Sequence, residues 1–131
     1  MRLLLDTHVL LWWHNQQARL TETAYDAIHD LGNDMFSSVV NGWEIQFKAQ
    51  LGKLTLSKPL SVILQEEQAT NGFRLLPVTI EHVYALDSFP LHHRDPSDRL
   101  LIAQAYREGL TLVTHDPKLS PYSVLCSGSE A

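Results

Sequence analysis

One stretch of the chain reads His92-His93-Arg94-Asp95-Pro96-Ser97-Asp98-Arg99, and the apolar run Leu100 to Tyr106 follows it. This stretch predicts a helix of about fourteen residues, because Asp95 is a good N-cap, Pro96 suits the first helical position and Gly109 can end the helix in a left-handed conformation. The next residues, Leu110 to Thr114, have the composition of a buried strand. A helix that returns antiparallel to the strand it feeds begins over the edge where that strand ends. We therefore expect Asp98 to face Asp116 at this edge.

Two further acidic residues are expected at the same edge. The apolar strand Leu3-Leu4-Leu5 stops at Asp6, as the later strand stops at Asp116. A second strand, Asp34 to Ser38, turns at its serines into a helix from about Val39 to Leu51, which carries Glu44. Because this helix leaves the sheet from the carboxyl edge, its first two turns overhang the crevice in which parallel sheets bind ligands.

Strands and helices alternate along the whole chain, which predicts a single-domain α/β/α sandwich. Its central parallel sheet should have about four to five strands with right-handed connections. The domain is expected to span residues 1–126, with residues 127–131 as a flexible tail. The remaining expected elements are helices over residues 7–14, 21–31, 59–71 and 79–86 and strands over residues 73–78 and 122–126.

The helix from Val39 to Leu51 raises three expectations about its faces. Val40, Trp43, Phe47 and Leu51 are predicted to form its buried stripe. The spacing of Glu44 and Lys48 alone predicts an i,i+4 ion pair on an exposed face of the helix. Only the position of the helix at the crevice favours a role for Glu44 in a ligand site. Gly42 costs about 1 kcal/mol relative to alanine, which indicates close packing against the backbone there.

The composition is that of an ordinary globular protein, with 44% hydrophobic residues, 19% charged residues and a net charge of −5. No apolar run approaches the roughly 20 residues of a membrane helix, so no membrane association is expected. The single Cys126 excludes an internal disulfide, and the cytoplasm is the expected location. The negative charge argues against non-specific coating of nucleic acid, but a nuclease that holds metal ions in an acidic cluster remains compatible with it.

Asp6, Glu44, Asp98 and Asp116 would repel one another strongly if they converged without cations. Mg²⁺ or Mn²⁺ prefer such oxygen ligands, and metal-assisted hydrolysis is the chemistry that follows. Each acid also has an ordinary explanation: Asp95 and Asp98 suit the start of a helix, and Asp116 suits a turn. The prediction of a metal site therefore rests on the expected convergence of all four acids, not on any one of them. No histidine has clear zinc spacing, and none is assigned as a ligand.

Taken together, these residues resemble PIN-domain ribonucleases of the VapC type, the toxins of bacterial toxin–antitoxin pairs. The resemblance is carried by Leu5-Asp6-Thr7-His8-Val9-Leu10-Leu11-Trp12, by Ser37-Ser38-Val39-Val40-Asn41-Gly42-Trp43-Glu44-Ile45, by the segment from His92 to Ala105, and by Val113-Thr114-His115-Asp116. It covers nearly the whole chain and implies a PIN-like, Rossmann-like fold. Asn41 and Ser97 depart from the family pattern, which often has serine and phenylalanine at these positions.

The resemblance implies that Asp6, Glu44, Asp98 and Asp116 hold Mg²⁺ or Mn²⁺, with Thr7, Thr114 and Asp95 beside them. It further implies cleavage of phosphodiester bonds in single-stranded or loop RNA, inhibition by a cognate antitoxin, and a homodimer. Basic residues around the crevice would contact the RNA, and the candidates are Lys48, Lys53, Arg94 and Arg99. Arg99 is alternatively the ion-pair partner of a neighbouring acid.

Two other functions are compatible with these residues. A PIN-like domain without catalysis would only bind RNA or protein, although the presence of all four acids argues against it. A phosphatase-like or receiver-like domain would use an aspartate as a nucleophile, and a stable aspartyl-phosphate on Asp6 would distinguish it.

Overall fold

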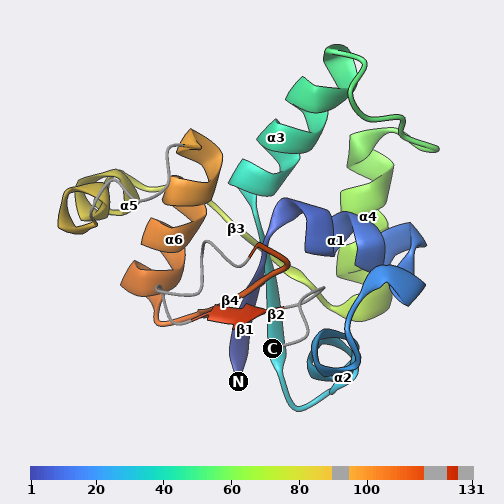
Figure 1. Ribbon diagram of the computed structural model, residues 1–131, viewed down its shortest axis with the longest axis horizontal. Helices are drawn as coiled ribbons and strands as arrows, with labels where there is room; N and C mark the ends of the chain where they lie inside the picture. The colour runs from blue at the N-terminus through green and yellow to red at the C-terminus, as the bar shows by residue number, and fades with distance from the viewer. Residues whose placement is uncertain (90–94, 117–123, 127–131) are drawn as a thin grey trace.

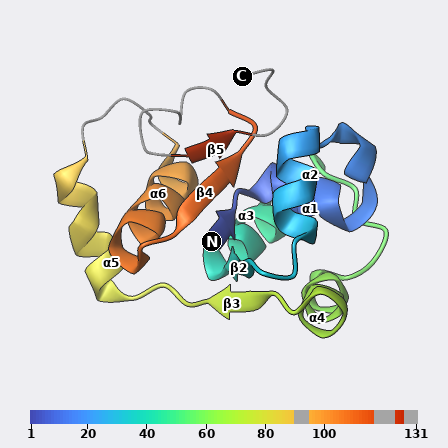
Figure 2. The same cartoon turned by 90° about the horizontal axis from the view of Figure 1, so that it is seen from below.

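The structure of the protein is a computed structural model, and it describes residues 1–89, 95–116 and 124–126. Five strands form one sheet in the order β3-β2-β1-β4-β5, and all neighbouring strands are parallel. Figure 2 shows them side by side between two groups of helices. Their bounds are β1 Arg2–Leu5, β2 Asp34–Ser38, β3 Arg74–Leu76, β4 Thr111–Thr114 and β5 Val124–Cys126.

Helices cover both faces of this sheet. In Figure 1, α1, α2 and α4 lie on one side of the strands, α5 and α6 lie on the other, and α3 rises from the end of β2. The α-helices are α1 Thr7–Asn15, α2 Glu22–His29, α3 Val39–Gln50, α4 Leu60–Asn71, α5 Ile80–Ala85 and α6 Pro96–Glu108, and two short 3-10 helices span Gln17–Arg19 and Leu86–Ser88. The predicted three-layer sandwich with a parallel sheet is therefore confirmed.

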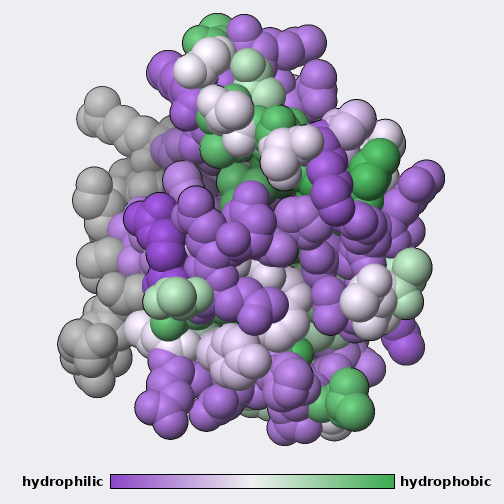
Figure 3. Space-filling model, turned by 90° about the vertical axis from the view of Figure 1, so that its right-hand side faces the viewer, coloured by the Kyte–Doolittle hydropathy of each residue, from purple (hydrophilic) through white to green (hydrophobic). Residues whose placement is uncertain are grey.

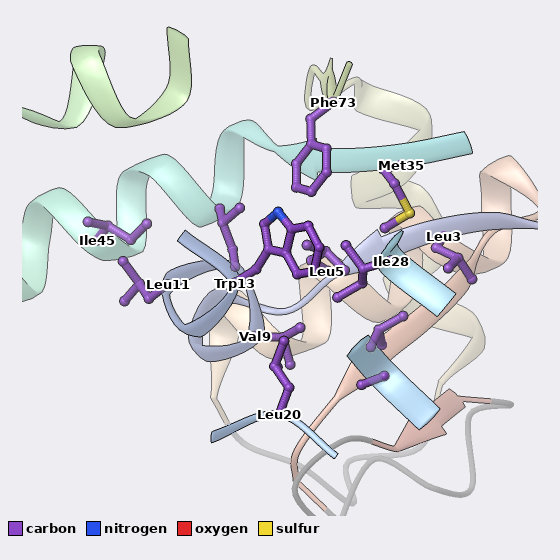
Figure 4. Close-up of a cluster of buried hydrophobic side chains, with 13 residues drawn as sticks. Leu3, Leu5, Val9, Leu11, Trp13, Leu20, Ile28, Met35, Ile45 and Phe73 are labelled. Carbon is purple, nitrogen blue, oxygen red and sulfur yellow. The ribbon is translucent and has the colours of Figure 1, made fainter. Parts of the chain in front are cut away.

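The central strand β1 is buried on both faces, as parallel strands usually are. Leu3 and Leu5 belong to the apolar cluster under α1 and α2, whereas Leu4 belongs to the cluster under α6. Figure 4 shows the first cluster, in which Trp13 lies among side chains from α1, α2 and the sheet. Its neighbour Trp12 is only partly buried.

The signals that predicted α6 are confirmed. The Asp95 carboxylate accepts hydrogen bonds from the backbone N–H groups of Ser97 and Asp98, at 2.9 and 3.2 Å, and Pro96 occupies the first turn. Gly109 ends the helix with φ 68°, a conformation that side chains other than glycine adopt at a cost. The chain then enters β4 directly, so the start of α6 is placed at the edge where β4 ends.

The predicted buried stripe of α3 is wrong for three of its four members. Val40 is buried, but Trp43, Phe47 and Leu51 are 57%, 52% and 54% exposed. The buried face of α3 instead carries Val40 and Ile45 together with the polar Asn41 and Glu44. Two polar residues on this face have buried partners, and a pattern based on hydrophobicity therefore chooses the wrong side of the helix.

Several expectations fall on residues that the structure does not describe. They are Arg94 with the preceding histidines, the start of the predicted strand over residues 122–126, and the proposed tail 127–131. Among the described residues, no helix is long and apolar enough to cross a bilayer. The face shown in Figure 3, on the side of α1, α2 and α4, is mostly hydrophilic, with scattered apolar residues.

Candidate metal centre

A cavity of about 160 Å³ lies at the carboxyl edge of the sheet. It sits where β1 adjoins β2 on one side and β4 on the other, the position at which open parallel sheets bind ligands. All four predicted acids line it: Asp6, Glu44, Asp98 and Asp116. The other lining residues are Thr7, His8, Lys48, Asp95 and His115.

Asp6 is the most constrained of the four acids. It follows β1, is only 4% exposed, and caps α1 by accepting the Val9 N–H on Oδ1 at 3.1 Å. Its Oδ2 accepts the Thr114 hydroxyl and lies 3.5 Å from His115 Nδ1. Burial raises the pKa of Asp6, but the interactions with His115, Thr114 and Val9 outweigh burial and hold the pKa below its ordinary value. Asp6 is therefore a carboxylate at neutral pH.

Glu44 reaches the cavity from the second turn of α3 and is 8% exposed. The Thr7 hydroxyl donates to its Oε1 at 2.7 Å, and Lys48 Nζ lies 2.7 Å from its Oε2. The i,i+4 pair with Lys48 thus exists, but the expectation that it lies on an exposed face is wrong for Glu44. Thr7, at the start of α1, holds the carboxylate toward the cavity from the other side.

Asn41 ties the α3 side of the site to β1. Its side-chain N–H groups donate to the Leu5 carbonyl and to the Thr7 hydroxyl, both at 3.1 Å, and its Oδ1 accepts the backbone N–H of Ser38 at 2.7 Å. The sequence marked Asn41 only as a departure from the family pattern. No local signal reveals its role, because its partners lie up to 36 residues away.

The remaining acids arrive from α6 and from the end of β4. Asp98 lies in the first turn of α6, where the helix dipole favours a negative charge. The backbone N–H of Asp116 donates to the Thr114 hydroxyl at 3.1 Å, so Thr114 contacts both Asp6 and Asp116. Asp95, at the rim, caps α6 and also lines the cavity.

Two histidines, to which the sequence analysis assigned no role, border the cavity. The rings of His8 and His115 meet edge to face with centroids 4.8 Å apart, and Trp12 packs on both. The Asp6 carboxylate raises the pKa of His115, whereas burial and His115 lower the pKa of His8. Trp12 thus lies beside the cavity through its contacts with these two histidine rings. The Arg19 guanidinium lies over the Trp12 ring in a cation–π contact at 4.6 Å.

The donor set of the cavity fits a hard divalent cation, since four carboxylates supply oxygen ligands. Among the described residues, however, no three acidic, histidine or cysteine side chains already stand close enough to hold one ion. Lys48 and Thr7 engage Glu44, and Thr114 and Val9 engage Asp6. The acids would therefore have to turn toward the centre of the cavity when an ion binds.

The family of this chain follows from comparison with known proteins. The PIN domain model matches residues 3–124. A curated relative, ribonuclease VapC22 of Mycobacterium tuberculosis, is 32% identical over 118 residues, which is 88% of each chain. This chain belongs to the PIN-domain family and is of the VapC type.

Solved structures show the same fold as this PIN domain. The VapBC2 complex of Rickettsia felis bound to a promoter DNA fragment contains a chain with a TM-score of 0.70 and 16% identity, which covers 95% of this chain and 96% of that one. The FitAcB structure from Neisseria gonorrhoeae gives a TM-score of 0.61 and 21% identity, with 95% of each chain covered.

The four basic residues expected to contact RNA in this PIN domain are placed differently. Lys48 lines the acidic cavity. Lys53 and Arg99 do not belong to its described lining, and Arg94 lies outside the described residues. Of these four residues, only Lys48 lines the cavity within the described part of the chain.

Proposed function

We propose that this PIN domain is a divalent-metal-dependent endoribonuclease and acts as the toxin of a toxin–antitoxin pair. The single observation that carries the proposal is the cavity in which Asp6, Glu44, Asp98 and Asp116 converge from β1, α3, α6 and the end of β4. Membership of the VapC type supports RNA as the substrate, because the related VapC22 is named a ribonuclease. Solved relatives that are complexes of a toxin with an antitoxin support an antitoxin as the partner.

The chain's own residues have separable tasks in this proposal. Asp6, Glu44, Asp98 and Asp116 would hold Mg²⁺ or Mn²⁺, which supplies an activated water and charge neutralisation at the scissile phosphate. Thr7 and Thr114 orient Glu44 and Asp6 through their hydroxyl groups. Lys48 places a positive charge beside the acids, and its pKa is raised because the Glu44 contact outweighs the effect of burial. Lys48 is therefore protonated and attracts the phosphate backbone of the substrate.

An aspartyl-phosphate mechanism would use Asp6 as its nucleophile. Both oxygens of Asp6 accept hydrogen bonds within the described residues, from Val9 and from Thr114, and the side chain is buried. A nucleophilic oxygen and a metal ligand would each use a remaining lone pair of this carboxylate. A stable aspartyl-phosphate on Asp6 would therefore be the observation that distinguishes this mechanism from metal-assisted hydrolysis.

The proposal is tested by cleavage of a single-stranded RNA pool with Mg²⁺, with Mn²⁺ and with a chelator. We expect cleavage only with metal, and a loss of at least about 100-fold in rate for Asp98→Asn, because removing one ligand charge weakens the ion. Asp87→Asn, an exposed acid in the 3-10 helix Leu86–Ser88, is the matched control and should retain full activity. Equal cleavage by Asp98→Asn and the unmodified chain would contradict the proposal.

Complete absence of cleavage with retained RNA binding would favour the alternative of a PIN-like domain that only binds RNA or protein.

The proposed partners, an antitoxin and a second copy of the chain, are tested separately. Co-expression with a candidate antitoxin should give a complex without nuclease activity, and light scattering of the purified chain should report the proposed homodimer.

A further inference from the structure

A second cavity, of about 250 Å³, adjoins the acidic one. It lies between α3 and the start of α6, and its lining shares Glu44, Lys48 and Asp95 with the acidic cavity. The rest of its lining is Trp43, Phe47, Pro96 and Ser97. We call the part formed by Trp43, Phe47 and Pro96 the aromatic slot. A group held at the acids therefore has an apolar space directly beside it.

The aromatic slot has the chemistry of a stacking surface. The Trp43 and Phe47 rings lie one helical turn apart, stacked with centroids 6.3 Å apart and planes 30° from parallel. Both side chains are more than half exposed, although they are among the largest apolar residues of the chain. Large apolar side chains that lie together on a surface often mark a site that binds a ligand or another macromolecule, because their burial is favourable.

We propose that the aromatic slot holds one unpaired nucleobase of the RNA, next to the phosphate that would meet the divalent ion held by the acids. The inference rests on the proposed function and adds a determinant of its substrate. The acidic cavity is small and lined mostly by charged side chains, so the nucleoside attached to a bound phosphate must lie outside it. The adjoining slot offers planar rings to the base, and Lys48, which borders both cavities, offers a positive charge to the linking phosphate.

This arrangement selects single-stranded or loop RNA. A base within a duplex is already stacked on both faces and cannot enter a slot between two helices without being unpaired. Every base has an aromatic face, so the slot selects strandedness more than sequence.

The test measures which nucleotide the slot contacts. A short single-stranded RNA is prepared with a non-hydrolysable phosphonate linkage at the cleaved bond and with one abasic site, which is moved step by step across that bond. Its binding to the unmodified chain with Mg²⁺ is followed by fluorescence anisotropy. We expect one abasic position to weaken binding by about 5- to 150-fold, the equivalent of losing one base–aromatic stack. The same abasic position should have little further effect once Trp43→Ala is added.

Three variants separate stacking from other contacts. Trp43→Phe keeps an aromatic ring and should retain most of the binding, whereas Trp43→Leu keeps apolar area without a planar ring and should bind as poorly as Trp43→Ala. Tyr84→Ala removes another exposed aromatic ring, on α5, and should leave binding unchanged. Variants that are unfolded by circular dichroism are replaced by Phe47→Leu, for which the same loss is expected.

The inference and the proposed function fail in different ways. If the RNA is cleaved normally by Trp43→Ala and Trp43→Leu and no abasic position matters, the nucleobase slot is wrong while the nuclease stands. If Trp43→Ala converts a dimer to a monomer in light scattering, or loses inhibition by the antitoxin with unchanged RNA binding, the slot is a protein interface and the inference is overturned. If the RNA is bound with the expected abasic effect but never cut, the nuclease proposal fails.

Discussion

At the level of single residues, Thr7 connects the two sides of the acidic cavity. Its hydroxyl donates to Glu44 and accepts from Asn41, so one oxygen links the start of α1 to the buried face of α3. Two buried polar side chains depend on it.

We predict that Thr7→Val lowers both stability and activity. Leaving the buried Asn41 and Glu44 groups without this partner should cost about 1–3 kcal/mol in the free energy of unfolding. Glu44 would also lose the contact that directs it into the cavity, so metal-dependent RNA cleavage should fall by about tenfold or more. Thr7→Ser retains the hydroxyl and should restore most of both quantities. Urea denaturation and cleavage rates measure them, and a Thr7→Ser variant as impaired as Thr7→Val would contradict this role for the hydroxyl.

Asp95 gives a prediction about pH. Burial raises its pKa, but the hydrogen bonds from Ser97 and Asp98 and the charge of Lys48 hold the pKa below its ordinary value. A carboxylate with a lowered folded-state pKa stabilises the fold above its unfolded value, about 3.9, and this stabilisation is lost as the pH falls through the folded pKa.

The corresponding experiment compares the unmodified chain with Asp95→Ala across pH without divalent metal. At pH 7 the variant should be less stable by about 1 kcal/mol, because the N-cap of α6 is lost. This difference in stability between the two proteins should shrink below about pH 4, where the Asp95 carboxylate becomes protonated. Asp95→Asn keeps a capping oxygen and should lie between the two proteins at neutral pH. A constant difference between pH 7 and pH 3 would show that the ionised carboxylate is not the stabilising species.

All four acids were placed from sequence, and three of them stand at a recognisable boundary. Asp6 and Asp116 follow apolar strands, and Asp98 lies in a helical first turn with a clear cap. Glu44 was placed only by the position of its helix at the crevice, and its burial depends on Thr7, 37 positions earlier. Asn41 and the two histidines were missed for the same reason, since their partners are distant in sequence.

At the level of elements, the limits of α3 were predicted correctly, but the face of the helix that is buried was not. Its limits follow from the Ser38 cap, but its buried face includes Gly42 and polar residues in contact with α1 and β1. The exposed face carries the aromatic residues instead. Hydrophobic spacing alone chose the face with the larger apolar side chains.

Gly42 allows a prediction for this helix. A methyl group built at Gly42 would lie 3.6 Å from Leu64 and 3.8 Å from Leu60, which are ordinary van der Waals distances. The close backbone packing expected from the sequence therefore leaves room for a methyl group. Gly42→Ala should stabilise the fold by about 1 kcal/mol, because alanine has the higher helix propensity.

Thermal denaturation should show this gain as a rise of about 4 °C in Tm. Gly72→Ala is the matched control, because Gly72 has φ 67° at the end of α4. A side chain added at this backbone conformation should lower the stability of the fold. A lower Tm for Gly42→Ala would mean that α3 cannot accommodate even a methyl group toward α4.

At the level of the whole molecule, the sheet order β3-β2-β1-β4-β5 determines where the site forms. The alternation of elements predicted the parallel sheet, and the general rule for such sheets predicted the edge. The order of the strands was not predicted, because it depends on the packing of α1 and α6 on opposite faces of β1.

Divalent metal should stabilise the whole domain. The four acids repel one another in the folded state, and an ion that binds only there shifts the unfolding equilibrium by about 1.4 kcal/mol at ten times its Kd. We expect Mg²⁺ or Mn²⁺ to raise Tm at matched ionic strength, and a chelator to reverse the rise. Asp98→Asn should show a much smaller shift, and an identical shift in that variant would place the stabilising ion elsewhere.

The bond between Thr114 and Asp6 spans 108 residues, nearly the length of the chain. Asp6 leaves the ribosome well before Asp98, Thr114 and Asp116, which come later in the sequence. Since chains are made from the N-terminus at about 5–20 residues per second, a growing chain spends several seconds with β1 paired on one side only and with half of the acids missing. The order of synthesis therefore delays the complete site until the segment that carries α6 and β4 has been made.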